Sequence, residues 1–244
     1  RPRRPGRIDA GRAMSVIVVF LLTIGGIAGW WLVRQGLLTK PWLESGSGPI
    51  PDDLPLPTAK IGLVVFLAVV GCLFALFASA YFMRMDYADW QNMPVPRLLW
   101  MNTAVLVLSS VLLQCAVVAA RQDDLVTVRL GLTAGGVAAV AFLAVQLLIW
   151  RELTASGFLV DRNPANSFFY MITGMHGLHL LGGLAALALP LAGAWRGAVT
   201  GRLQLRIELC ATYWHFLLFV WFALVVLFMG WAREFIDLCG QLLS

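Results

Sequence analysis

The chain has 244 residues, of which 60% are hydrophobic and 13% are charged, and its formal net charge is +5. Soluble domains carry about 25% charged residues, so this composition indicates an integral membrane protein and excludes a soluble enzyme. A membrane-spanning helix needs about 20 residues, so six spans with short loops account for nearly the whole length and leave no room for a separate catalytic domain.

Residues 1–13 are predicted to form a basic arm, because five of the first twelve residues are arginine. An arm of this kind beside a first helix is typical of a topology or lipid-headgroup signal, so we expect no nucleic-acid partner. Residues 14–34 predict the first transmembrane helix. Residues 35–59 contain five prolines, which predicts a stiff, non-helical loop.

The later apolar runs predict a five-helix transmembrane region over residues 60–231, followed by a C-terminal tail over 232–244. The expected helices are 60–83, 97–120, 129–150, 167–192 and 208–231. The predicted fold is therefore all-α, a polytopic membrane helix bundle with about six transmembrane helices.

All three histidines lie in two clusters within these apolar helices. The first is Thr173-Gly174-Met175-His176-Gly177-Leu178-His179, and the second is Tyr213-Trp214-His215-Phe216. One hypothesis is a bis-histidine haem b site formed by His179 and His215, which would make the chain a small electron carrier. The other is a set of hydrogen bonds between helices, which the spacing favours.

Other polar residues are sparse in the predicted helices. Asn102 and Gln146 are single polar points, and Glu208 lies at the start of the last helix. Acids in mid-span are absent, which makes a transporter the less favoured alternative. The four cysteines are scattered singly, and three histidines alone do not complete a zinc or copper site, so we expect no metal ligands in this chain.

Two motifs together resemble subunit III of the haem–copper terminal oxidases. Two stretches of the chain are similar to the last two helices of that family. The first contains Ser167-Phe168-Phe169 and Thr173-Gly174-x-His176-Gly177-x-His179, and the second contains Glu208, Tyr213-Trp214-His215-Phe216 and Trp221. Leu99 to Ser110, containing Asn102-Thr103, resembles its fourth helix, and Gly131 to Gln146 resembles its fifth. The resemblance covers residues 60–231, with a looser match at 14–34.

The resemblance implies an accessory, non-redox subunit of a respiratory oxidase, a divergent six-helix member of the family. In the family, haem and copper belong to subunits I and II, so it implies no catalytic, cofactor-binding or metal-binding residue here. It implies partners in oxidase subunits I and II and in bound membrane phospholipids. Cytochrome c or quinol would be reached only through the complex, which reduces oxygen and pumps protons. The Arg-, Ala- and Gly-rich composition favours a multi-pass protein of the bacterial plasma (inner) membrane.

By the same resemblance, the motif residues have structural and lipid-cleft roles that support subunit I and sustain turnover. These residues are Asn102, Thr103, Gln146, Thr173, Gly174, His176, Gly177, His179, Glu208, Tyr213, Trp214, His215, Phe216 and Trp221. Three positions depart from the family pattern, because Val70, Ile149 and Leu218 stand where the family usually has acids. Apolar residues have no desolvation cost in lipid, so these exchanges are expected to stabilise the helices, and the roles of those acids are not carried over.

The sequence gives two conflicting indications of membrane topology. An arginine-rich arm on the inner side would, by alternation, place the C-terminus inside, whereas the family order places it outside. Lysine and arginine in the rest of the chain favour the family order, with eight on its inner side and five on its outer side. The inner set is Arg34, Lys40, Lys60, Arg121, Arg129, Arg196, Arg202 and Arg206, and the outer set is Arg84, Arg97, Arg151, Arg162 and Arg233.

Overall fold

A computed structural model describes residue 26 and residues 56–85, 87–91, 96–160, 162–197 and 200–230. Residues 56–229 form one compact unit. The basic arm at 1–13, the C-terminal tail at 232–244 and, apart from the helical Gly26, the first expected helix at 14–34 lie outside the described residues.

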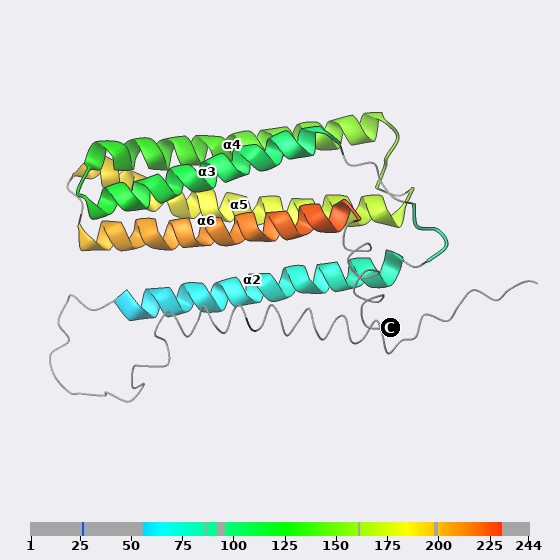
Figure 1. Ribbon diagram of the computed structural model, residues 1–244, viewed down its shortest axis with the longest axis horizontal. Helices are drawn as coiled ribbons and strands as arrows, with labels where there is room; N and C mark the ends of the chain where they lie inside the picture. The colour runs from blue at the N-terminus through cyan, green and yellow to red at the C-terminus, as the bar shows by residue number, and fades with distance from the viewer. Residues whose placement is uncertain are drawn as a thin grey trace, which may run out of the picture. The chain divides into compact units, whose positions relative to one another are not determined.

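Five helices make up this unit, and all five are long and apolar enough to cross a membrane (Figure 1). They are α2 (Leu56–Met85), α3 (Leu98–Arg121), α4 (Leu125–Ala155), α5 (Pro164–Arg196) and α6 (Gly201–Phe228). The described part of the chain contains helices and turns without a strand. The all-α prediction is therefore confirmed, and the structure describes five of the roughly six expected spans.

Four of the five helices are longer than the apolar runs that predicted them, and α3 has the length of its run. The expected loop at 35–59 ends earlier, because α2 begins at Leu56 and has a proline, Pro57, in its first turn, where no backbone N–H is needed. The last helix begins at Gly201 rather than 208, since the Thr200 side chain accepts a hydrogen bond from the Leu203 N–H. Hydropathy detects only the part of a helix in hydrocarbon, and polar helix ends extend beyond it.

Side-chain caps also fix the starts of α4 and α5. Asp124 accepts hydrogen bonds from the N–H groups of Val126 and Thr127. Asn163 accepts one from Ala165 and stands directly before a proline, which suits the first helical position. The Asn163 amide also donates to the Gln91 carbonyl at 2.6 Å, which ties the α2–α3 connection to the start of α5.

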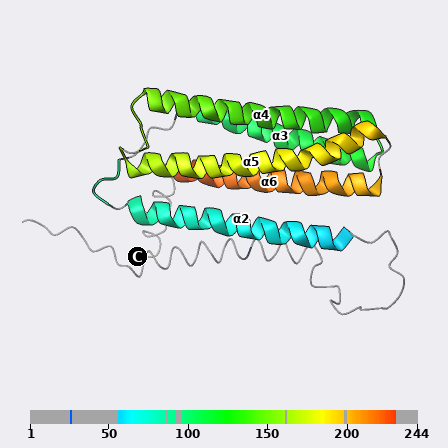
Figure 2. The ribbon, with the colours of Figure 1, turned by 180° about the vertical axis from the view of Figure 1, so that it is seen from behind.

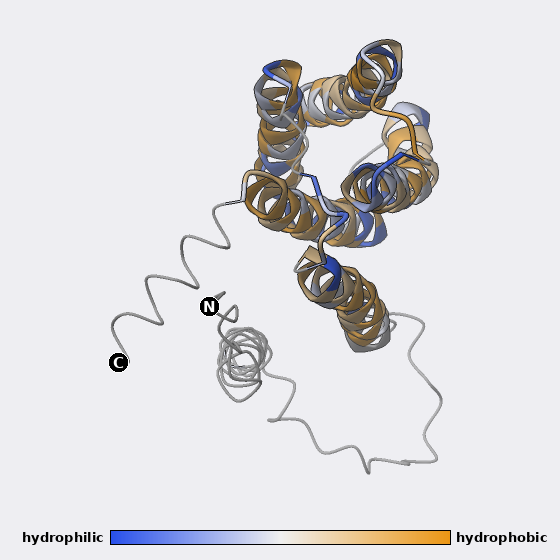
Figure 3. Cartoon of the chain, turned by 90° about the vertical axis from the view of Figure 1, so that its right-hand side faces the viewer, coloured by the Kyte–Doolittle hydropathy of each residue, from blue (hydrophilic) through white to orange (hydrophobic). Residues whose placement is uncertain are grey.

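Helices α3, α4, α5 and α6 form a closed ring in which each packs against two neighbours. The α3–α4 hairpin is packed closely, because a Cβ atom at Gly131 or Gly135 would lie only 2.9 Å from atoms of α3. Helix α2 lies outside the ring and packs against α6 and α5, as Figures 1 and 2 show from opposite sides. Seen along their axes, the helices consist mostly of apolar residues (Figure 3). Large apolar side chains remain exposed on each of them, which suits a hydrocarbon environment.

Candidate functional site

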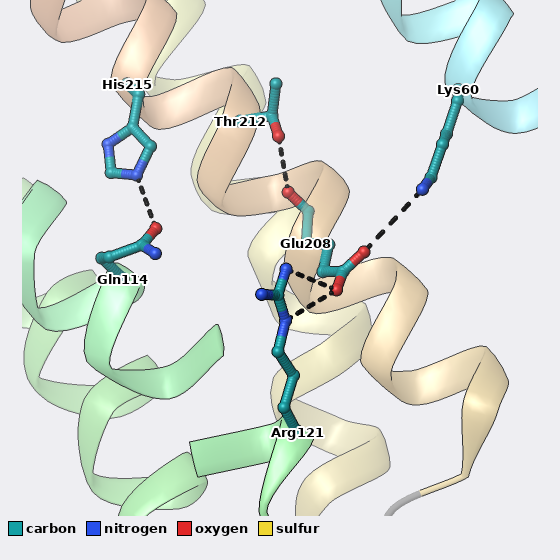
Figure 4. Close-up of polar contacts among 6 residues, drawn as sticks. All are labelled: Lys60, Gln114, Arg121, Glu208, Thr212 and His215. Carbon is teal, nitrogen blue, oxygen red and sulfur yellow. Dashed lines mark hydrogen bonds and ion pairs between the residues drawn. The ribbon is translucent and has the colours of Figure 1, made fainter. Parts of the chain in front are cut away.

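His215 of α6 is hydrogen-bonded to α3 through both ring nitrogens. Its Nδ1 lies 2.5 Å from the Ser110 Oγ. Its Nε2 lies 2.9 Å from the Gln114 Oε1, which is the contact drawn in Figure 4. An amide oxygen only accepts, so Nε2–H donates to Gln114, while the Ser110 hydroxyl occupies Nδ1. Both ring nitrogens are therefore engaged, and neither is free to bind haem iron.

His176 lies in the centre of the ring of helices and is fully buried. Its Nε2–H donates to the Leu217 carbonyl at 3.1 Å, which joins α5 to α6. The imidazole packs against the indole of Trp221, with ring centroids 4.9 Å apart, and against Phe142 of α4 at 5.9 Å. Its surroundings are therefore a packed aromatic core that links three helices.

His179 has separate surroundings from those of His215. Its Nδ1–H donates to the Met175 carbonyl of the preceding turn at 2.8 Å. The ring lies against Phe74 of α2, with centroids 5.5 Å apart. The His179 carbonyl accepts a hydrogen bond from the Tyr213 hydroxyl at 2.8 Å. His179 thus contacts α2 while His215 contacts α3, and the pair proposed as haem ligands is not brought together around a common site.

The two tryptophans of the α6 motif donate hydrogen bonds to α3. Trp214 Nε1–H donates to the Ser109 Oγ at 3.0 Å, and Ser109 in turn donates to the Gly135 carbonyl of α4 at 2.8 Å. Trp221 Nε1–H donates to the Thr103 Oγ1 at 3.0 Å. Both indoles are fully buried, so each needs the polar partner that α3 supplies.

A second polar contact, between Asn102 and Gln146, joins α3 to α4. The Asn102 amide donates to the Gln146 Oε1 at 2.9 Å, and both side chains are buried. On the α4–α5 side, Trp150 Nε1–H donates to the Thr173 Oγ1 at 3.2 Å. Buried polar groups in a membrane protein need such partners, because lipid offers none.

The two motif glycines of α5 face α4 at different distances. A Cβ atom at Gly174 would lie 3.3 Å from the Trp150 ring, closer than an ordinary van der Waals contact, so a small residue there lets the helices approach. A Cβ atom at Gly177 would lie at an ordinary contact distance, 3.5 Å from Leu143. Phe216, next to His215, has its ring 3.6 Å from the position that a Cβ atom of Gly71 on α2 would take, which is also an ordinary contact.

Glu208 ties three helices together at one end of the bundle. Its Oε1 accepts from Arg121 at 3.0 Å and its Oε2 lies 4.0 Å from the Lys60 ammonium, so α6 is paired with both α3 and α2 (Figure 4). The Glu208 carbonyl also accepts from the Thr212 hydroxyl. At the opposite end, the guanidinium of Arg84 pairs with Asp89 and holds the pKa of that carboxyl below its ordinary value.

The three positions that lack the family's acids differ in burial. Val70 and Ile149 are buried, with 3% and 0% of their surface exposed, whereas Leu218 is half-buried. Within the described residues, no group of three histidine, cysteine or acidic side chains could hold a metal ion.

Sequence reasoning did not identify several partners of the motif residues. Ser109 and Ser110 connect α3 to Trp214 and His215, and Trp150 binds Thr173. The adjacent pair of hydroxyls in the middle of an apolar helix was the available signal for the serines, because serine in a membrane helix usually marks a helix contact. Trp150 lies near a helix end, where tryptophan usually marks the membrane interface, so its sequence position gave no signal of this contact.

This fold and these contacts define a multi-pass membrane protein whose motif side chains join helices. The sequence model of the family described as cytochrome c oxidase subunit III matches residues 58–233, which is well over half of the chain. The chain therefore belongs to the cytochrome c oxidase subunit III family, and it is an accessory, non-catalytic component of a haem–copper oxidase complex.

Similar proteins come from bacteria and from an animal. A Mycobacterium bovis protein named probable cytochrome c oxidase subunit 3 is 30% identical over 170 residues, which are 68% of this chain and 84% of that protein. Cytochrome c oxidase subunit 3 of Petromyzon marinus is 25% identical over 232 residues, covering 88% and 82%. Subunit 3 of the cytochrome bo(3) ubiquinol oxidase of Pseudomonas aeruginosa is 34% identical over 92 residues, covering 37% and 44%.

Proposed function

We propose that this chain supports subunit I of its oxidase by helix packing and bound phospholipid, and so sustains turnover. Haem and copper would reside in subunits I and II, and cytochrome c or quinol would be oxidised there. The observation that carries the proposal is the use of the motif side chains. Four ring N–H groups of the motifs donate hydrogen bonds to a neighbouring helix, which suits a scaffold. They belong to His176, His215, Trp214 and Trp221.

The surface of α2 supports a role in contacting lipid or a partner subunit. Only 17% of the residues in its most apolar stretch are buried by the rest of the structure. Large apolar side chains such as Val65, Val69 and Leu76 remain exposed on this helix. In a bilayer they would face lipid chains, the sixth helix that we expect at 14–34, or subunit I.

We further propose that the protein lies in a bacterial plasma membrane in the topology of the family. Antiparallel packing of the five helices gathers the start of α2, the α3–α4 turn and the α5–α6 connection at one end (Figure 1). The basic residues at this end are Lys60, Arg121, Arg129, Arg196, Arg202 and Arg206. By the positive-inside rule this end would face the cytoplasm.

The experiment that tests the function is a mild-detergent affinity purification of the tagged chain, with its partners identified by mass spectrometry. Recovery of a large haem–copper subunit in about equal amount would support the proposal. Recovery of the chain alone, with a b-type absorption band, would refute it in favour of the haem b carrier. Recovery of the chain alone without haem would also refute it, and flux measurements in liposomes would then test the transporter alternative.

A further inference from the structure

Three polar side chains inside the ring of helices use only part of their hydrogen-bonding capacity. Asn102 donates to Gln146, and His176 donates through Nε2–H to the Leu217 carbonyl. The other polar atoms of these side chains are the Asn102 Oδ1, the Gln146 Nε2 and the His176 Nδ1. All three are buried and lack a hydrogen-bond partner among the residues that the structure describes.

Packing between α4 and α5 brings Gln146 and His176 to the same level. Phe142 lies one turn before Gln146, and its ring centroid is 5.9 Å from that of His176. Trp150 lies one turn after Gln146 and would be 3.3 Å from a Cβ atom at Gly174. Gln146 therefore faces the turn of α5 that carries His176.

Packing between α6 and α3 brings Asn102 to this level as well. The indole of Trp221 packs on His176 with ring centroids 4.9 Å apart. The same indole donates from Nε1–H to the Thr103 Oγ1 at 3.0 Å, directly beside Asn102. Asn102 also bonds directly to Gln146, so the Asn102–Gln146 pair and the Trp221 indole link the three incomplete side chains within the core.

The chemistry of the three atoms is complementary to a water molecule. The Gln146 Nε2 is a donor, and the Asn102 Oδ1 is an acceptor. The His176 Nδ1 is also an acceptor, because the ring carries its proton on Nε2. A water molecule can accept one hydrogen bond from the Gln146 Nε2 and donate one each to the Asn102 Oδ1 and the His176 Nδ1. Three hydrogen bonds are typical of a buried water.

We propose that the three unpaired atoms converge on one ordered water molecule, which bridges α3, α4 and α5 through Asn102, Gln146 and His176. The water gives a hydrogen-bond partner to each of three buried polar atoms. An unpaired polar atom in the core of a membrane protein lowers stability. It also fixes the register of the three helices, since each contributes one partner. This proposal is independent of the proposed role in the oxidase.

The direct test is a cryo-electron microscopy map of the complex that contains this chain, at a resolution where buried waters are visible. We expect a separate density peak within about 3 Å of all three atoms. Two results would overturn the proposal. One is continuous protein packing with no peak, and the other is a second direct bond from the Gln146 Nε2 to the Asn102 Oδ1.

A pair of variants tests whether the water occupies space. In Asn102→Gln the amide is one methylene longer and can take the place of the water, so the midpoint temperature of unfolding should stay within about 2 °C of the wild type and the density peak should disappear. In Asn102→Leu, which has a similar size but no polar atom, the midpoint should fall by several degrees. An equal fall in both variants would show that the site has no room for water, because the longer amide would then overpack the core.

Discussion

At the scale of single residues, the polar side chains of the motifs act as pairs rather than as isolated groups. His215 shows this clearly, because Ser110 and Gln114 occupy its two ring nitrogens. A side chain with one free nitrogen could bind a metal or carry a proton. A side chain with both engaged holds two helices together.

Replacement of His215 by alanine should loosen the α3–α6 contact without affecting haem. The loss of two hydrogen bonds is expected to cost about 1–2 kcal/mol. The measurement is the fraction of the chain that stays with the oxidase in detergent and the number of turnovers before inactivation. Ser110→Ala, which removes one of the two bonds, should give a smaller effect. Loss of haem with unchanged assembly would contradict the structural role.

Ile149 is a second residue whose environment predicts a clear result. It is fully buried, at a position where the resemblance leads us to expect an acid in the family. Ile149→Glu should lower the free energy of unfolding by about 3 kcal/mol or more, because the carboxylate would have no partner in the core. The yield of folded chain in membranes measures this effect, and Ile149→Leu is the matched control of similar volume. A normal yield of the glutamate variant would mean that an acid can still find a partner here.

At the scale of helices, close approach and capping decide how the elements fit together. Gly183 of α5 is the tightest contact, since a Cβ atom there would lie 2.8 Å from the rings of both Trp214 and Tyr213. Its neighbour Gly182 has nothing within 4 Å of the same position. The two adjacent glycines therefore differ only in what they face.

This difference predicts opposite outcomes for two matched substitutions. Gly183→Ala should push α6 away from α5 and lower the free energy of unfolding by about 1–3 kcal/mol, as overpacking does. Gly182→Ala should leave stability unchanged or slightly raised, because alanine favours helix over glycine. Thermal unfolding of both variants in detergent measures the effect. Equal midpoints would show that the Gly183 contact is not a constraint.

The cap of α4 predicts a dependence on pH. Hydrogen bonds from the Thr127 side chain and backbone hold the pKa of Asp124 below its ordinary value of 3.8. Since the folded pKa is lower than the unfolded one, the stabilisation is complete above the unfolded pKa and is lost as the pH falls through the folded pKa. In Asp124→Asn, which keeps a capping side chain without a titrating group, this loss should disappear. Unfolding midpoints between pH 3 and 7 for both chains test the prediction, and parallel curves would contradict it.

At the scale of the whole molecule, the ring of α3–α6 is closed by polar contacts on every side, while α2 is attached more loosely. Successive helices of the ring are joined by hydrogen bonds that involve Asn102, Thr173, His176 and Trp214. Helix α2 is joined mainly by apolar packing and by the Lys60–Glu208 ion pair, which is partly exposed and so contributes little stability.

The two ends of the helix bundle differ in their number of lysine and arginine residues, and this difference predicts the membrane orientation. In a chain without its native cysteines, a cysteine at Gly201, at the start of α6, should react with an impermeant maleimide only after the cells are permeabilised. A cysteine at Ser156, between α4 and α5, should react in intact cells. The reverse pattern would show that the N-terminal arginines set the orientation rather than the charges of the described helices.

The sequence by itself determined the class of the protein, the approximate positions of five helices and the family. Apolar runs of spanning length have only one stable solution in lipid, and the paired motifs with His176 and His215 were specific enough to indicate subunit III. Sequence did not determine which polar groups meet, because a helix pattern gives the face of a residue and not its neighbour. Only the tertiary structure paired Asn102 with Gln146 and Trp214 with Ser109, since these contacts depend on the relative register of helices that are far apart in the chain.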